Sequence, residues 1–391
     1  MKKFKKVLSI VLVAILSMGT LAACGSKDDA TTFKIGGIGP LTGGAAIYGV
    51  AVRNGAQIAV DEINAAGGIN GVQIEFRMED DEHDAEKSVN AYNALKDWGM
   101  KILMGTVTST PCLAVIPHSS ADGVFQITPS ASSARVVADN DNVFQVCFND
   151  PNQGIGSAQY IGQVGIMTDD GNYVSNIAII YDSSCAYSSG IYEKFVAEAA
   201  NQPFSIVATE AFTSESNTDF SVQLQKARDA GAQMVFLPIY YKEAALILTQ
   251  AAAMEYNPVF FGCDGLDGIL SVENFNTSLA EGVILLTPFV ASATDSKTTA
   301  FVAEYQNRHG EIPNQFAAGA YDAIYIIKAA IEKSGAKPSM SVSELGEALI
   351  KAVTEITYSG ITGENMTWLV TGEVNKAPKA MVIVNGVYVG L

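Results

Sequence analysis

The chain has 391 residues, of which 41 are acidic and 24 are basic, so its formal net charge is −17. Nucleic acids and anionic lipid surfaces attract proteins with basic patches, and this acidic balance argues against both as direct partners. The length is sufficient for two domains or lobes, each with a core of its own.

The N-terminus has the pattern of a secretory signal. Four lysines within positions 2–6 precede an uncharged apolar stretch from Val7, which ends in the small residues Ala22 and Ala23 before Cys24. The stretch is short for a permanent span of a ~30 Å hydrocarbon core. Its end resembles the bacterial lipobox, in which the cysteine becomes a lipid-modified N-terminus.

We therefore predict that residues 1–23 are removed, that Cys24 is lipidated, and that residues 24–32 tether the protein to the membrane. Removal would take away four lysines and no acid, leaving 20 basic against 41 acidic residues and a net charge of −21. The mature protein would work at the outer face of the bacterial cytoplasmic membrane.

The chain then alternates between strands and helices. Apolar runs predict strands at 33–38, 72–79, 102–104, 124–128 and 143–147. Helical periodicity predicts helices at 48–65, 84–97 and 110–121. Regular alternation of this kind is typical of a parallel sheet covered on both faces by helices.

A second run repeats this order. It predicts helices at 153–167, 188–200, 220–230 and 242–254, and strands at 176–181, 204–211, 234–237, 259–261 and 282–286. Three helices follow at 298–308, 319–334 and 342–351. The tail reads as antiparallel strands at 367–369, 380–384 and 387–390, with a turn at Asn385-Gly386.

The predicted fold class is α/β, with two Rossmann-like lobes joined by a hinge. We assign residues 33–149 and 277–355 to lobe 1, and residues 150–276 and 356–391 to lobe 2. Polar loops follow predicted strands at 106–110, 128–133 and 262–268. Because ligands of such folds bind at the carboxyl ends of the strands, we expect a small-molecule site between the lobes.

Other chemistries find little support. The three histidines accompany no GxSxG or HExxH motif, so we expect neither an enzyme nor a cofactor. The glycine-rich segment 36–44 is not a phosphate loop, since Pro40 lacks the N–H group such a loop needs. The acidic segment 79–84 matches no calcium-binding loop and reads as a solvated helix entrance.

The cysteines other than Cys24 are widely spaced and form no CxxC motif, which argues against a metal site. In an exported protein they could be free or could form a bridge, and both states stay open. They are Cys112, Cys147, Cys185 and Cys263.

Residues 35–76 resemble the opening of the type I periplasmic solute-binding proteins, and most closely the branched-chain amino-acid (Leu/Ile/Val) binding proteins of ABC transporters. Further segments continue the resemblance in order, so that it covers about residues 33–389. These segments are Asp80-Asp81, Gly105 to Ser109, Thr128 to Ser132, Tyr321 to Ala323, and Gly360 to Gly363 followed by Trp368.

The resemblance implies a binding lipoprotein, expected as a monomer, that closes around an amino acid and delivers it to a permease. It also implies roles for eight residues. The α-carboxylate would be held by Ser109, Ser130 and Ser132, and the α-ammonium by Asp264, where relatives often carry Glu. Aromatic walls would come from Tyr48, Tyr187, Tyr240 and Phe316.

Elementary chemistry is compatible with these roles, because helix starts favour an anion and tyrosine offers an apolar wall, a hydroxyl and a face for a cation. The alternative is that these residues have structural roles only: the serines would cap helices, the aspartate would lie in a solvated turn, and the tyrosines would pack in the core. The ligand could also be an amide, urea or an aromatic acid, since relatives bind these. A ligand-sensing receptor component is the remaining alternative, although this chain shows no membrane span beyond the signal.

Overall fold

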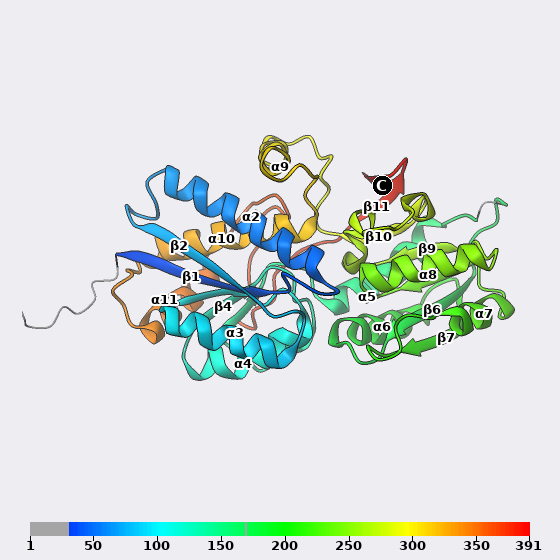
Figure 1. Cartoon of the computed structure of the whole chain (residues 1–391), viewed down its shortest axis with the longest axis horizontal. Helices are drawn as coiled ribbons and strands as arrows, with labels where there is room; N and C mark the ends of the chain where they lie inside the picture. The colour runs from blue at the N-terminus through cyan, green and yellow to red at the C-terminus, as the bar shows by residue number, and fades with distance from the viewer. Residues whose placement is uncertain (1–30, 169) are drawn as a thin grey trace, which may run out of the picture.

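The computed structural model describes residues 31–168 and 170–391, which form two lobes side by side along the long axis (Figure 1). The predicted signal peptide and Cys24 lie outside the described residues. Within the described part, no helix combines the length and the apolar character needed to cross a membrane.

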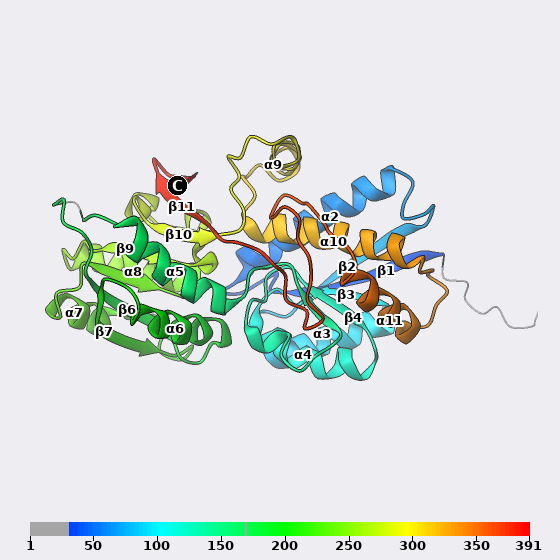
Figure 2. The same ribbon diagram turned by 180° about the vertical axis from the view of Figure 1, so that it is seen from behind.

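A five-stranded parallel sheet forms the centre of the first lobe, with the strand order β2-β1-β3-β4-β5. Its strands are β1 (Thr32–Gly39), β2 (Gln73–Asp80), β3 (Ile102–Gly105), β4 (Phe125–Thr128) and β5 (Val143–Gln145). The helices around it are α2 (Ala46–Ala65), α3 (Ala85–Trp98), α4 (Ser109–Ala121), α9 (Ser296–His309), α10 (Gln315–Ser334) and α11 (Val342–Val353). Figures 1 and 2 show α2 and α10 on one face of this sheet, and α3 and α4 on the other.

A seven-stranded sheet forms the centre of the second lobe, with the order β12-β11-β10-β9-β8-β6-β7. Its strands are β6 (Asn176–Asp182), β7 (Ser205–Phe212), β8 (Met234–Leu237), β9 (Val259–Gly262), β10 (Ile284–Thr287), β11 (Lys379–Val384) and β12 (Val387–Gly390). Its helices are α5 (Asp150–Val164), α6 (Ala186–Ala199), α7 (Ser221–Asp229) and α8 (Tyr241–Ala253). Strands β6 to β10 pair in parallel, whereas β11 pairs antiparallel with β10 and β12. The predicted α/β class is confirmed, with parallel strands flanked by helices in each lobe.

The predicted division of the chain between the lobes needs two corrections. Strand β10 was assigned to lobe 1 within 277–355, yet it pairs with β9 and β11 of the second sheet. The segment before β11 was assigned to lobe 2, yet it packs on the first: the Trp368 indole N–H donates to the Gln145 carbonyl at 2.8 Å, and Gln145 N donates to the Gly372 carbonyl at 2.9 Å. Figure 2 shows this late segment running across the back of both lobes.

The tail differs from the prediction in one strand. The turn at Asn385-Gly386 is present, with φ of 52° and 72° at its two central residues, as a type I′ hairpin turn requires. The expected strand at 367–369 is only an isolated bridge between Trp368 and Val374.

The acidic segment 79–84 is less solvated than expected. Asp84 caps α3 by accepting a hydrogen bond from Lys87 N at 2.8 Å, as a helix entrance should. Asp81, however, is 0% exposed, and its burial raises the pKa of its carboxyl group to about 7.

The four cysteines 112, 147, 185 and 263 are free and buried.

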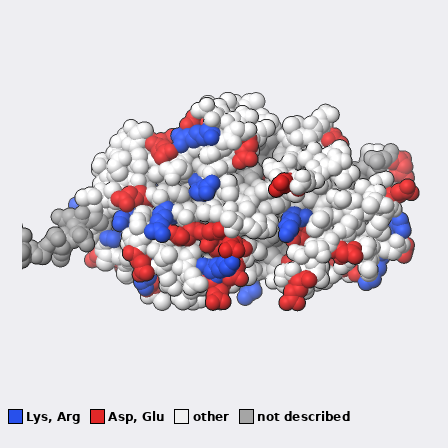
Figure 3. All heavy atoms as spheres, viewed as in Figure 1, with Lys and Arg blue, Asp and Glu red and all other residues white. Residues whose placement is uncertain are grey.

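The described surface carries its charges in small groups. Basic side chains on the face shown in Figure 3 are interspersed with acidic ones. Ion pairs of the described residues include Arg308 with Glu304 at 2.6 Å. A continuous basic area is not seen on this face, in agreement with the charge argument against nucleic acid.

The close packing of α2 on α10 generates a stability prediction. A Cβ atom on Gly55 would lie 2.1 Å from the Ala317 carbonyl oxygen, so Gly55→Ala forces the two helices apart. We expect a loss of about 1–3 kcal/mol in the free energy of unfolding, measured by urea denaturation.

Gly156→Ala in α5 is the matched control, because its Cβ would meet its nearest atom, Pro378 Cγ, at an ordinary 3.5 Å. Alanine at an accommodating helix position should stabilise by about 0.5–1 kcal/mol. Equal stability of the two variants would contradict the packing argument.

Candidate functional site

A small cavity lies between the lobes, where the strands of both sheets end. Seven of the eight sequence-predicted residues line it. Its lining consists of Tyr48, Val107, Thr108, Ser109, Ser130, Tyr187, Tyr240, Asp264, Gly265 and Phe316. The eighth predicted residue, Ser132, is fully buried in the same loop as Ser130 but does not line the cavity.

Serine hydroxyls connect the loops after β3 and β4 on the first-lobe side. Ser130 Oγ donates to the Val107 carbonyl at 2.6 Å, and Ser109 Oγ accepts from Ser133 N at 3.2 Å. Ser109 is the first residue of α4, and its N-cap residue Thr108 makes no side-chain capping bond. The first turn of α4 therefore offers backbone N–H groups and the positive end of the helix dipole to an anion.

Aromatic side chains from both lobes close the cavity around Tyr48. The Tyr48 ring stacks on Phe316 with a centroid distance of 4.0 Å and meets the edge of Tyr240 at 5.3 Å. Its hydroxyl donates to the Gly265 carbonyl and accepts from Tyr241 N, both in the second lobe. Tyr48 is therefore at once a packing residue and a contact between lobes.

Asp264 supplies the negative charge on the second-lobe side. It begins a short 3-10 helix after β9 and is 2% exposed. Burial raises the pKa of its carboxyl group to about 6, while the polar side chains of Tyr187, Gln315 and Gln153 beside it oppose this rise. No Lys or Arg belongs to the cavity lining in the described structure, so the chain itself places no cation there.

A second buried carboxyl group, which the sequence analysis missed, lies close to Asp264. Asp150 is the first residue of α5 and is 0% exposed. Burial raises the pKa of its carboxyl group well above the usual range, and the charge of Asp264 raises it further. In the sequence, Asn149-Asp150-Pro151 reads as an ordinary helix start, so no local signal marks Asp150 as a site residue.

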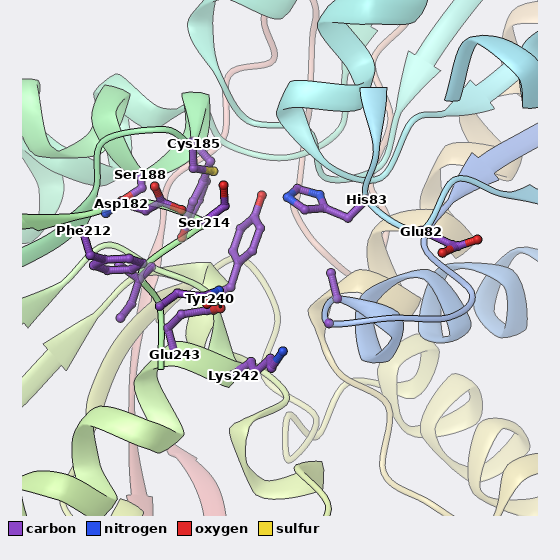
Figure 4. A pocket seen from close by; sticks show the side chains of 15 residues that line it. Glu82, His83, Asp182, Cys185, Ser188, Phe212, Ser214, Tyr240, Lys242 and Glu243 are labelled. Atoms are coloured by element: carbon purple, nitrogen blue, oxygen red, sulfur yellow. Dashed lines mark hydrogen bonds between the residues drawn. The ribbon is translucent and has the colours of Figure 1, made fainter. Parts of the chain in front are cut away.

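A polar pocket of about 150 Å³ lies on the other side of Tyr240, between the lobes (Figure 4). It shares Tyr187 and Tyr240 with the small cavity, and His83 of the first lobe lies across from Asp182, Cys185 and Glu243 of the second. Tyr240 therefore separates the inner cavity from this outer polar pocket.

A larger groove of about 780 Å³ lies elsewhere, between α2, the loop before α10 and β12. Its walls are mainly apolar and include Ile47, Val50, Ile312 and Val387. None of the predicted site residues lines this groove, so size alone does not locate the candidate site.

Comparison with known proteins identifies the family of this chain. The family model described as periplasmic binding protein matches residues 32–386. This chain belongs to that family. The Leu/Ile/Val-binding protein BraC3 of Rhizobium johnstonii is 30% identical over 365 residues, which cover 92% of this chain and 94% of the relative. A leucine-, isoleucine-, valine-, threonine- and alanine-binding protein of Pseudomonas aeruginosa is 28% identical, with 88% and 89% covered.

Solved structures agree with this periplasmic binding protein fold. The branched-chain amino acid transporter substrate-binding protein LivJ of Streptococcus pneumoniae, in complex with isoleucine, has a TM-score of 0.80 and 28% identity, covering 92% of this chain and 100% of that one. A solute-binding protein from R. palustris in complex with benzoate also has a TM-score of 0.80, with 92% and 95% covered, but its 18% identity supports the fold alone. The relatives' names describe solute binding rather than catalysis, as predicted for this chain.

The hydroxyl group of Tyr187 generates the prediction for this site. It accepts from Gly265 N at 2.9 Å, and its hydrogen bond to Asp264 lowers the pKa of that carboxyl group. Tyr187→Phe should therefore raise the pKa of Asp264 above its value of about 6. Infrared titration of the carboxyl band in ligand-free protein measures this change, with Asp264→Asn identifying the band.

Tyr192→Phe is the matched control, since Tyr192 lies in the same helix and stacks on Tyr181 at 4.0 Å. It should leave the Asp264 band unchanged. The same pKa for Asp264 in Tyr187→Phe and in the unmodified protein would disprove the proposed hydrogen bond.

Proposed function

We propose that this protein is an extracytoplasmic binding lipoprotein that captures a branched-chain or other apolar amino acid and delivers it to an ABC transporter permease. The observation that carries the proposal is the pairing, in one cavity, of a helix start with serine hydroxyls and a buried carboxyl group on the facing lobe. A zwitterion with an apolar side chain matches that arrangement.

The first lobe suits the ligand's α-carboxylate. Ser109, Ser130 and the uncapped first turn of α4 supply hydroxyl and N–H groups at one end of the cavity. Such donors hold an anion without Lys or Arg, because several N–H dipoles converge at a helix start. Ser132 follows in the same loop but does not line the cavity, and its hydroxyl lies at the Asp150 carboxyl group instead.

The second lobe suits the ligand's α-ammonium. An ionised carboxylate in a dry site is costly without a cation. Asp264 meets that description, and the faces of Tyr187 and Tyr240 beside it can shield the bound cation. A ligand ammonium group would therefore offset the free-energy cost of burying the ionised Asp264 carboxylate.

Closure of the two lobes completes the site. Tyr48 reaches from the first lobe to Gly265, and Gln315 N of α10 donates to Asp267 Oδ2 of the second lobe at 2.8 Å. Because these contacts need the lobes together, a ligand held by both lobes favours the closed form. We propose that the permease binds this closed form, and that the lipid on Cys24 keeps the protein close to the permease.

An aromatic acid or an amide is the alternative ligand class. The structure of the R. palustris protein with benzoate shows that this fold also accommodates an acid without an ammonium group. In the present chain such a ligand would leave Asp264 buried without a countercharge. The charge of the site therefore favours an amino acid.

One prediction of this proposal concerns the role of Asp264 in binding the ligand's ammonium group. Asp264→Asn removes the countercharge while keeping the shape, and leucine affinity should fall tenfold or more, equivalent to ~1.4 kcal/mol or more. Titration calorimetry after unfolding and refolding, which removes carried-over ligand, measures the dissociation constant. Asp229→Asn on the exposed surface of α7 is the control and should bind as the unmodified protein does. Unchanged leucine affinity in Asp264→Asn would exclude the ammonium role.

Another prediction of this proposal concerns how leucine affinity depends on pH. The pKa of Asp264 is raised to about 6, so its carboxyl group is ionised above that pH and neutral below it. Leucine itself stays zwitterionic in this range, so its affinity should decline as the pH falls from 7.5 to 5. This decline should be smaller in Asp264→Asn. Dissociation constants that do not change with pH in the unmodified protein would contradict an ionised Asp264 in the site.

A further inference from the structure

Unpartnered polar atoms gather at one buried place beside the cavity. Both carboxyl oxygens of Asp150, Ser132 Oγ and Gln153 Nε2 have no hydrogen-bond partner of good geometry among the described residues. The Ser132 hydroxyl is the polar side chain nearest in effect, since it lowers the pKa of the Asp150 carboxyl group. All three residues are fully buried. Since buried polar groups are almost always paired, this concentration indicates that the place receives a polar group from elsewhere.

These residues connect directly to the proposed ammonium site. Asp150 N donates to the Ser132 carbonyl at 2.8 Å, and Gln153 Oε1 accepts from Asp264 N at 3.3 Å. Burial raises the pKa of the Tyr240 hydroxyl, and the charge of Asp150 is among the groups that raise it further. Asp150 itself does not line the cavity, but it lies within electrostatic reach of both Asp264 and Tyr240, which do.

The position of the Asp150 carboxyl group is also fixed by its close contact with helix α6. A Cβ on Gly190 of α6 would lie 2.9 Å from Asp150 Oδ2, so the carboxyl group occupies space that only a glycine leaves free. The same helix carries Tyr187. Helices α5 and α6 thus hold Asp150 against the wall that also supplies a tyrosine to the cavity.

Neither protonation state of Asp150 is satisfied by the described chain alone. The ionised form would be buried beside Asp264, a group of the same sign, and only the Ser132 hydroxyl lowers the pKa of its carboxyl group against burial and that charge. The protonated form would bury an O–H group that has no well-aligned acceptor among the described residues. A cation that enters with the ligand would satisfy both carboxyl groups.

We propose that Asp150 is a second carboxylate of the ammonium site, so that Asp264 and Asp150 together hold the ligand's cationic nitrogen. This inference rests on the proposed function and narrows its ligand class. The ligand needs a free, protonated amino group, and acids or amides that lack one are rejected because two acidic groups would stay uncompensated.

Asp150→Asn tests the inference through a ratio of affinities. We measure leucine and its analogue without the amino group, 4-methylpentanoate, by calorimetry on the same protein. Loss of Asp150 should weaken leucine binding tenfold or more, while the affinity for 4-methylpentanoate stays the same or rises. The ratio matters because a purely structural defect lowers both affinities together.

Asp322→Asn is the matched control. Asp322 is a buried carboxyl group of α10 that accepts hydrogen bonds from Ile361 N, Thr362 N and Thr362 Oγ1, and neither of these partner residues lines the cavity. Its substitution should cost stability but leave the ratio of the two affinities unchanged. If Asp150→Asn does not fold by circular dichroism, Gly190→Ala replaces it, since the added Cβ displaces the Asp150 carboxyl group.

The outcomes separate the two proposals. If Asp264→Asn weakens leucine binding and Asp150→Asn does not, or lowers both affinities equally, the role of Asp150 is overturned and the proposed function stands. If the unmodified protein binds 4-methylpentanoate as tightly as leucine, the proposed function itself fails. A selective loss of leucine binding in both variants supports both proposals.

Discussion

Burial of carboxyl groups between the lobes is the constraint on which the rest of the site depends. Asp264 is almost completely withdrawn from water, and its negative charge is stabilised only in part by the side chains of Tyr187, Gln315 and Gln153. Gln315 comes from the first lobe and Tyr187 from the second, so the same closure that buries the charge assembles its partners. A cationic ligand then adds the missing compensation, which couples ligand binding to closure.

Much of this arrangement could be predicted from the sequence. The alternation of apolar strands with amphipathic helices has a strong period, and polar loops at strand ends indicate where ligands of such sheets bind. The individual residues needed the family resemblance, because a serine before a helix has the same local pattern as a cap. With it, seven of the eight predicted residues line one cavity, although their roles in binding remain predictions.

The features that the sequence could not provide depend on tertiary partners. The apolar run of β10 would suit either sheet, and only its pairing with β9 and β11 places it in the second lobe. Trp368 sits in the predicted second-lobe tail, yet its indole reaches back to Gln145 of the first. Asp81 and Asp150 each resemble an exposed acid at a helix entrance, where charge and helix dipole are a sufficient local explanation. Their burial comes from elements distant in sequence.

The resemblance implies that many relatives carry Glu where this chain has Asp264, and this difference in length bears on the proposed role of Asp150. An aspartate carboxyl group stays one methylene closer to its own backbone, here to the 3-10 helix after β9, and thus reaches less far toward a ligand in the cavity. That backbone already contacts α5, since Asp264 N donates to Gln153 one turn from Asp150. An ammonium group drawn toward the shorter Asp264 side chain is drawn toward α5 as well. The short Asp264 side chain and the buried carboxyl group on α5 are therefore two parts of one proposed site.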